Sequence, residues 1–325
     1  MVLRVYRRSA FTLIELIVVL SIIALLAALT VSAVFRLREG QNETNTNKHL
    51  LKIQVGLDQQ WKAMMDRISA EPVPDLIYEL TKKPDGTRDV PRAKALHLKL
   101  RLRQEFPQNY AEARFLIPPV NGMLTPQQAA FLNQTYGPKP LYLAAIGNGN
   151  GTPVTEAAAL LVIALSQTRG GANFNIEEAG PVQQIDVGGK LQRVMVDSWG
   201  NPICLRRWAT DVETDAINEL NQPPFISATA LATGNRDPQD PEGRLRIAAG
   251  PTWGFPPNGP NFRPMVLLWF TTPLPMVAEP FDCPPAMGNG NLNRGPYVVS
   301  SGKNGNFMDP DDLYSFRLQR EGKGN

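Results

Sequence analysis

The chain has 325 residues, a formal net charge of +3 and an apolar fraction of 43%. Charge this evenly balanced gives no strongly basic face, so nucleic-acid binding is not expected. The apolar fraction is that of a globular protein, and the length is enough for one large domain or two ordinary ones with buried cores. The 29 prolines predict long, stiff loops.

The N-terminus has a short basic leader followed by a long apolar run. Three of the first eight residues are arginine, and mostly apolar residues extend from Phe11 to Phe35. A helix needs roughly 20 apolar residues to cross a bilayer, so this run is long enough. The basic leader places the N-terminus in the cytoplasm. Glu15 lies inside the run, where a carboxylate is costly, and it therefore suggests a function.

Two ordinary explanations compete for this stretch. One is a secretory signal that is cleaved near Val31-Ser32-Ala33, and the other is a signal anchor that is never processed. The apolar run is longer than the usual core of a secretory signal, and it contains an acid. Both features argue against the secretory signal.

The motif AFTLIE at residues 10–15, with the leader and the apolar run, resembles the class III signal of type IV pilins and type II secretion pseudopilins. The resemblance implies that prepilin peptidase cleaves between Ala10 and Phe11 and methylates the new amine of Phe11. It also implies that Glu15 pairs with the positive N-terminus of a neighbouring subunit in a filament. The family usually has Gly before the cleavage site, where this chain has Ala10.

The helix is expected to continue to about residue 70, because Pro72 and Pro74 then end it. Gly40 and the Asn/Thr-rich residues after it have low helix propensity, which predicts a local weakening. Beyond that point, apolar residues recur at spacings of three and four and predict one buried stripe. These residues are Leu50, Ile53, Leu57, Trp61, Met64 and Ile68.

Residues 71–180 are expected to form a helical insertion. In residues 92–106 leucines alternate with basic residues, which favours a strand, but the composition and length favour a helix. We expect a helix with a solvated cationic face, with contact to anionic lipid as the alternative. Thr125-Pro126 and Thr152-Pro153 are typical helix starts, with Thr as N-cap and Pro in the first turn.

Catalytic motifs are missing from the sequence, so an enzyme is not expected. Residues 147–151 (GNGNG) superficially resemble a phosphate-binding loop, but no Lys follows at the required position, and a flexible turn is favoured. There is no Cys-x-x-Cys, His-Glu-x-x-His or Gly-x-Ser-x-Gly. His49 and His97 have no evident nucleophile or metal partner and are interpreted as surface or packing residues.

Residues 181–210 are predicted to form strands around a tight turn. The turn is made by Asp197, Trp199, Gly200 and Pro202, with Ser198 and Asn201 between them, and Gly and Asn-Pro are turn formers. It is similar to the Asp-x-Trp-Gly-x-Pro turn of major pseudopilins, which implies a structural role. Further on, residues 222–264 and 273–296 are predicted loops, with a strand-like apolar run between them.

The C-terminal region is predicted to form a strand and turn at residues 297–302, followed by an Asp-rich loop. This loop resembles the calcium-binding loop of major pseudopilins, and calcium prefers hard oxygen ligands. The resemblance implies a calcium ion held by Asn304, Asp309, Asp311 and Asp312. The alternative is a turn that caps an element without metal.

The two cysteines, Cys204 and Cys283, both follow the membrane-length run, where the compartment permits a disulfide. A bridge between them would close a loop of roughly 80 residues and stabilise the fold by ~4 kcal/mol. Two separate buried thiols are the alternative, and spacing alone does not decide between them.

Together these features predict an α+β, pilin-like architecture. A long N-terminal transmembrane helix packs on a head with a helical insertion and an antiparallel sheet. The expected parts are a leader (1–10), a transmembrane helix (11–35), its periplasmic continuation (36–70), the insertion (71–180) and the sheet head (181–325).

The resemblance implies a structural subunit of a type II secretion pseudopilus, held in the bacterial inner membrane with a periplasmic head until it joins a filament. The implied partners are prepilin peptidase, other copies, minor pseudopilins, the inner-membrane assembly platform and lipid. The alternatives are a type IV pilus subunit for adhesion, motility or DNA uptake, and a membrane-anchored periplasmic binding protein or enzyme.

Overall fold

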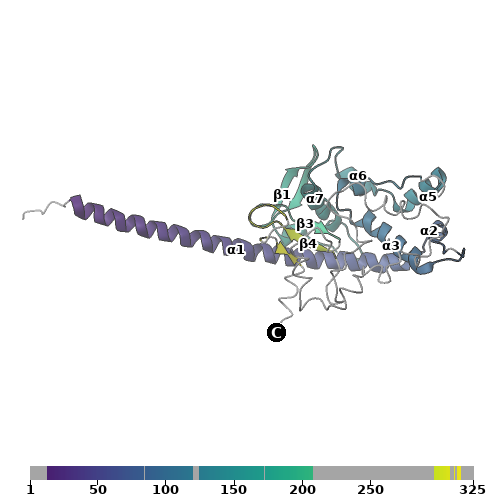
Figure 1. Cartoon of the computed structure of the whole chain (residues 1–325), viewed down its shortest axis with the longest axis horizontal. Coiled ribbons are helices and arrows are strands. Elements are labelled where there is room, and N and C mark those ends of the chain that lie inside the picture. Colours follow the sequence, from purple (N-terminus) through teal and green to yellow (C-terminus); the bar gives the residue numbers. More distant parts are fainter. Residues whose placement is uncertain are drawn as a thin grey trace, which may run out of the picture. The chain divides into compact units, whose positions relative to one another are not determined.

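The computed structural model describes residues 13–83, 85–119, 124–171, 173–207, 296–307, 311 and 313–315. Within them the fold is α+β, with a long N-terminal helix, further helices and small antiparallel sheets (Figure 1). The chain divides into two compact units, Met1–Asn45 and Thr46–Asn325. The α+β class predicted from the sequence is therefore confirmed.

Helix α1 (Leu13–Ala70) has 58 residues and is about 90 Å long at 1.5 Å per residue. It ends just before Pro72, as predicted. Residues 40–47 are helical throughout, so the expected weakening at Gly40 does not interrupt the helix. A single glycine costs only about 1 kcal/mol of helix propensity, which a helix of this length tolerates.

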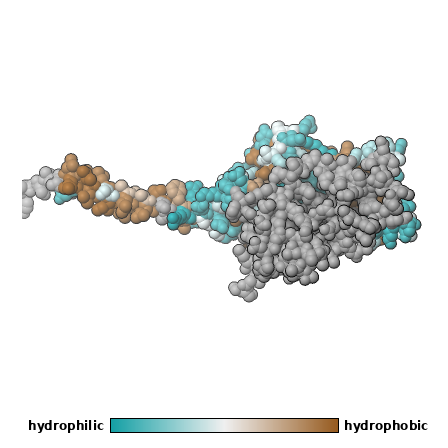
Figure 2. All heavy atoms as spheres, viewed as in Figure 1, coloured by the Kyte–Doolittle hydropathy of each residue, from teal (hydrophilic) through white to brown (hydrophobic). Residues whose placement is uncertain are grey.

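The two parts of α1 bury very different surfaces. The described large apolar side chains from Leu13 to Leu37 are all exposed, from 47% at Val19 to 78% at Leu13. Figure 2 shows this apolar surface over the first part of α1 and a hydrophilic surface after it. From Leu50 to Ile68 the predicted apolar stripe is buried in the core of the second unit, except for Trp61, which is partly buried against it.

The helices after α1 lie between residues 75 and 179 in the described part of the chain. The helix predicted over residues 92–106 is present as α3, and both predicted Thr-Pro starts form capping boxes, at Thr125 and Thr152. The helices are α2 (Asp75–Leu80), α3 (Val90–Glu105), α4 (Tyr110–Ala113), α5 (Pro126–Tyr136), α6 (Pro140–Ala145), α7 (Pro153–Leu165) and α8 (Ile176–Ala179).

Within the described residues the strands form two antiparallel sheets. Strands β1 (Val182–Asp186) and β2 (Leu191–Met195) make a two-stranded hairpin. The second sheet has the order β3-β4-β5, in which β4 pairs with both neighbours. Its strands are β3 (Cys204–Arg206), β4 (Tyr297–Ser300) and β5 (Leu313–Tyr314).

The core of the second unit lies between α1, α7 and the sheets. Leu50, Ile53 and Leu57 of α1 belong to the same buried cluster as Leu205 of β3 and Val298 of β4. Helix α7 packs against β2 and β3. The C-terminal sheet is therefore held directly on the second part of α1, beside α7 (Figure 1).

Candidate functional site

Glu15 is the first acid of α1 and lies in its first turn. A negative charge is favourable near a helix N-terminus, where backbone N–H groups lack helical acceptors. The neighbouring Ile14, Leu16 and Ile17 are exposed apolar residues. Ala10 and Phe11, the predicted cleavage and methylation residues, lie outside the described residues.

The predicted turn at residues 197–202 is organised by the carboxylate of Asp197, which is only 2% exposed. One oxygen, Oδ1, accepts hydrogen bonds from the backbone N–H groups of Trp199 at 2.9 Å and Asn201 at 2.8 Å. Gly200 has a φ of +94°, which a residue with a Cβ rarely adopts. Pro202 forms an isolated bridge with Val196, which closes the turn.

The turn also touches two distant segments. The other oxygen of Asp197, Oδ2, accepts a hydrogen bond from Ser300 Oγ at 2.6 Å. Asn201 Nδ2 donates to the carbonyl of Gly302 at 2.7 Å. Ser198 N donates to Thr46 Oγ1 in α1 at 3.0 Å. The Asp197 turn and the strand end at residues 300–302 are thus in direct contact with each other.

The loop proposed to bind calcium is only partly described, because Asp309 and Asp312 lie outside the described residues. Asp311 accepts hydrogen bonds from Asn304 N at 3.1 Å and from Asn304 Nδ2 at 2.8 Å. Asn304 Oδ1 accepts from Asn306 N at 2.7 Å. These contacts close the loop through N–H donors. In the described part, no three acidic, His or Cys side chains gather as a metal site, so calcium remains a prediction.

Cys204 is buried in β3, and its Sγ lies 3.3 Å from the carbonyl oxygen of Val154. Cys283 lies outside the described residues, as do the two predicted loops and the apolar run between them. The possible Cys204–Cys283 bridge therefore remains a prediction.

The glycines of residues 147–151 have a structural role. A Cβ on Gly149 would lie 2.3 Å from the carbonyl oxygen of Gly188, which belongs to the turn between β1 and β2. Arg114 donates hydrogen bonds to the carbonyls of Gly147 and Gly149. The loop is therefore packed backbone to backbone and held by an arginine, whereas the sequence favoured a flexible turn.

His97, Tyr136 and Glu71 form the arrangement most like a catalytic relay. His97 Nδ1 is 2.7 Å from Tyr136 Oη, and His97 Nε2 is 4.0 Å from Glu71 Oε2. Burial, and then the charge of Arg101, lower the pKa of His97 to about 4 against the opposing effect of Glu71. Burial also raises the pKa of Tyr136. Both shifts favour the neutral forms, so the arrangement suits packing and not nucleophile activation.

The expectation of a solvated cationic face on α3 is wrong. Arg92, Lys99, Arg101 and Arg103 are each at most 8% exposed. Their charges and stems are accommodated locally: Arg92 approaches Asp89 at 3.6 Å, and Arg103 lies over the ring of Phe115 at 3.9 Å. The physical reason is that Asp89 at the helix start, and Glu71 and Phe115 from other segments, compensate the loss of water at Arg92, Arg101 and Arg103. The alternation of leucine and basic residues does not reveal these partners.

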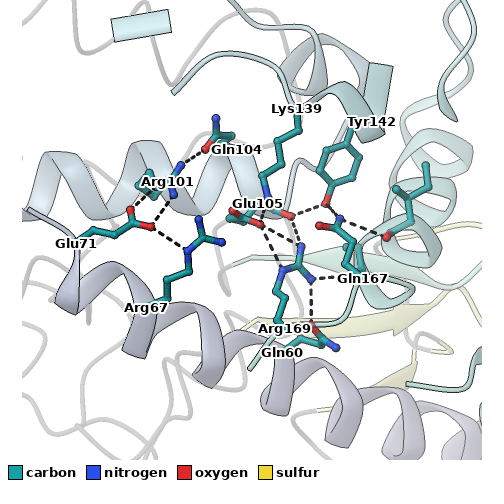
Figure 3. A network of polar contacts seen from close by, with 12 residues as sticks. Gln60, Arg67, Glu71, Arg101, Gln104, Glu105, Lys139, Tyr142, Gln167 and Arg169 are labelled. Atoms are coloured by element: carbon teal, nitrogen blue, oxygen red, sulfur yellow. Dashed lines mark hydrogen bonds and ion pairs between the residues drawn. The ribbon is translucent and has the colours of Figure 1, made fainter. Parts of the chain in front are cut away.

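Two ion-pair groups join α3 to its surroundings (Figure 3). Arg101 forms two hydrogen bonds to Glu71 at 2.8 Å each. Glu105, whose side chain is fully buried, contacts Lys139 at 2.5 Å and Arg169 at 3.3 Å. Arg169 also donates to Gln60 of α1 at 3.2 Å. The network connects α1, α3, α6 and the segment after α7.

Four residues that connect distant segments were not predicted from the sequence. They are Thr46, Gln54, Ser300 and Glu105. A signal existed for Gln54, which follows Leu50 by four residues and so interrupts the apolar stripe of α1 with a polar side chain. Such a position requires a buried partner. For Thr46 and Ser300 the sequence carried no signal, because each depends on a turn more than 100 residues away.

A comparison with protein-family models identifies a motif at the N-terminus that overlaps the start of α1. Residues 6–31 match the model of the prokaryotic N-terminal methylation motif. The chain therefore carries the class III signal of type IV pilins and pseudopilins, followed by a helix long and apolar enough to cross a membrane. The motif supports a type IV pilin-like subunit, and it implies processing by a prepilin peptidase and assembly with other pilin subunits. The long apolar helix suggests that the chain is anchored in a membrane. No curated protein and no solved structure matches the chain.

Proposed function

We propose that the chain is a structural subunit of a type II secretion pseudopilus, without enzymatic activity, that serves protein export. The observation that carries the proposal is the methylation motif at residues 6–31 continuing directly into α1. The contact between the Asp197 turn and Ser300 supports a pseudopilin in particular, because both segments resemble major pseudopilins.

In this proposal prepilin peptidase cuts between Ala10 and Phe11 in the inner membrane and methylates the amine of Phe11. The single helix holds the precursor with its N-terminus in the cytoplasm and its head in the periplasm. During assembly the exposed apolar side chains of residues 13–37 leave lipid and pack against other copies. Glu15 pairs with the N-terminus of a neighbour, which supplies the counter-charge that an acid in an apolar environment needs.

The proposed partners are prepilin peptidase, the inner-membrane assembly platform, minor pseudopilins and lipid. The test is mass spectrometry of the N-terminal peptide of protein purified from its own membranes. We expect an N-methylated chain that starts at Phe11. An intact leader, or a start near residue 34, would contradict the proposal and favour a membrane-anchored binding protein or enzyme. Normal filaments without any exported cargo would favour a type IV pilus subunit.

We also propose that a calcium ion binds to the C-terminal loop, held by Asn304, Asp309, Asp311 and Asp312. Calcium bound only to the folded state stabilises it by mass action. We expect added calcium to raise the melting temperature of the full chain in detergent, and an excess of chelator to reverse the rise. A melting temperature that is the same with calcium and with chelator would remove the metal from the proposal.

A further inference from the structure

The Asp197 turn, defined as residues 197–202, shares a buried contact with the C-terminal loop, defined as residues 300–307 with Asp311. Two contacts make the connection: Asn201 Nδ2 donates to the carbonyl of Gly302 at 2.7 Å, and Ser300 Oγ donates to Asp197 Oδ2 at 2.6 Å. The Ser300 hydroxyl also accepts from Gly302 N at 3.1 Å. Ser300 is 0% exposed. Because water does not reach this contact, its loss would leave the carboxylate short of a donor, which is costly in a buried position.

The other side of the same turn contacts α1. Ser198 N donates to Thr46 Oγ1 at 3.0 Å, and Thr46 is also 0% exposed. Thr46 is the first residue of the second compact unit. It lies in the stretch of α1 that is rich in Gly, Asn and Thr, where local helix propensity is weak. A tertiary contact at this residue therefore contributes an unusual share of the local helix stability.

A second connection holds the same sheet on α1 and does not pass through the turn. Gln54 Nε2 donates to the carbonyl of Pro296 at 2.8 Å, and Ser315 Oγ donates to Gln54 Oε1 at 2.6 Å. Gln54 lies eight residues after Thr46, or about 12 Å along the helix. Helix α1 is thus held at two separate points, at Thr46 by the Asp197 turn and at Gln54 by Pro296 and Ser315. The contacts at Gln54 do not pass through Asp197.

We propose that the Asp197 turn is a relay that couples the conformation of the C-terminal loop to the local stability of α1 at Thr46. If the loop moves Ser300, then Asp197 loses a donor, the turn relaxes, and Ser198 withdraws from Thr46. The coupling is reciprocal by thermodynamic linkage, so weakening the contact at Thr46 loosens the loop. The relay acts within one chain and does not require assembly.

Hydrogen exchange of the full chain in detergent, followed by mass spectrometry, tests the relay from both ends. Thr46→Val removes the acceptor for Ser198 but keeps the branched shape of the side chain. We expect exchange in peptides covering residues 301–307 to become at least fivefold faster, although Thr46 does not touch them. Thr46→Ser keeps the hydroxyl and should restore the original rate. Thr44→Val is the matched control, because the exposed Thr44 hydroxyl donates to the carbonyl of Gly40 in its own helix.

From the other end, Ser300→Ala should accelerate exchange at least threefold in peptides covering residues 45–50. Helix α5 is the internal reference and should keep its rate in every variant. Unchanged exchange in residues 301–307 of Thr46→Val would overturn the relay. So would a uniform acceleration that includes α5, because it would show a loss of global stability and no specific coupling.

Discussion

His97 is a titratable side chain placed where its charged form is costly. It is 3% exposed, and its pKa is lowered to about 4 by burial and by Arg101, although Glu71 opposes the shift. The unfolded chain, with an ordinary histidine pKa near 6.5, binds the proton at a higher pH than the folded chain does. The free energy of unfolding should therefore fall as the pH drops below about 6.5. Below about pH 4, His97 should cause no further decrease, because it is protonated in both the folded and the unfolded chain.

Between pH 7.5 and pH 5 this linkage predicts a loss of about 2 kcal/mol in the free energy of unfolding. His97→Gln keeps a hydrogen-bonding side chain opposite Tyr136 and removes the titration, so the variant should lose correspondingly less over the same range. Denaturant unfolding of the full chain in detergent at both pH values measures the difference. An identical pH dependence in the variant and the unchanged chain would show that His97 titrates normally.

Two glycines within α1 illustrate how an element depends on its surroundings. A Cβ on Gly40 would have no atom within 4 Å, whereas a Cβ on Gly56 would lie 2.2 Å from a ring atom of Phe174. Gly40→Ala should therefore stabilise the local helix by up to about 1 kcal/mol, since alanine is the better helix former. Gly56→Ala gains the same propensity but should destabilise the protein by roughly 1–3 kcal/mol through overpacking.

Helix content and hydrogen exchange over residues 38–46 measure the first effect, and the melting temperature measures the second. The two variants control for each other, because the substitution and the helix are the same. Equal effects of the two substitutions would mean that Phe174 does not pack against Gly56.

Glu105 connects α3 to two other segments, because its side chain contacts Lys139 and Arg169. Glu105→Gln keeps the shape of the side chain but leaves the partly buried Lys139 and the buried Arg169 without their carboxylate. Breaking a buried pair in this way costs about 3–5 kcal/mol, and we expect a loss of that order in the free energy of unfolding.

Thermal or denaturant unfolding of the full chain measures the effect of Glu105→Gln. Glu177→Gln is a matched control, because Glu177 pairs with Arg193 at 2.8 Å with both side chains about half exposed or more. Exposed pairs contribute at most about 1 kcal/mol. Similar losses in the two variants would refute the importance of burial at Glu105.

At the scale of the whole molecule, Glu15 separates membrane anchoring from assembly. Glu15→Ala removes a charge from the apolar run, so it should leave membrane insertion intact. It also removes the proposed partner of a neighbour's N-terminus, so we expect filament formation to be lost. Membrane fractionation and electron microscopy of sheared filaments measure the two outcomes.

Glu39→Ala is the control for this experiment, because Glu39 is an exposed acid of the same helix beyond the apolar run. It should change neither insertion nor assembly. Normal filaments from Glu15→Ala would show that this carboxylate does not contribute to assembly.

The features that the sequence determined by itself are those that depend on neighbouring residues. The leader, the apolar run and Glu15 lie within about 35 residues. Such a signal is recognised from consecutive residues and does not depend on the fold of the rest of the chain. The Thr-Pro capping boxes of α5 and α7 and the apolar stripe of α1 are local in the same sense. The capping boxes and the apolar stripe were predicted at the positions where the structure has them, whereas the leader lies outside the described residues.

Tertiary structure alone decided where the polar residues of the head lie. The cations of α3 were predicted to form a solvated face, because their partners are distant in the sequence. Arg101 pairs with Glu71, which is 30 residues away, and Glu105 pairs with Arg169, which is 64 residues away. The turn at Asp197 was recognised as a motif, but its distant contacts were not. Ser198 contacts Thr46, which is 152 residues away in the chain, and Asp197 contacts Ser300, which is 103 residues away. A buried charge or hydroxyl is stable only with a partner, and here the fold brings that partner from a distant part of the chain.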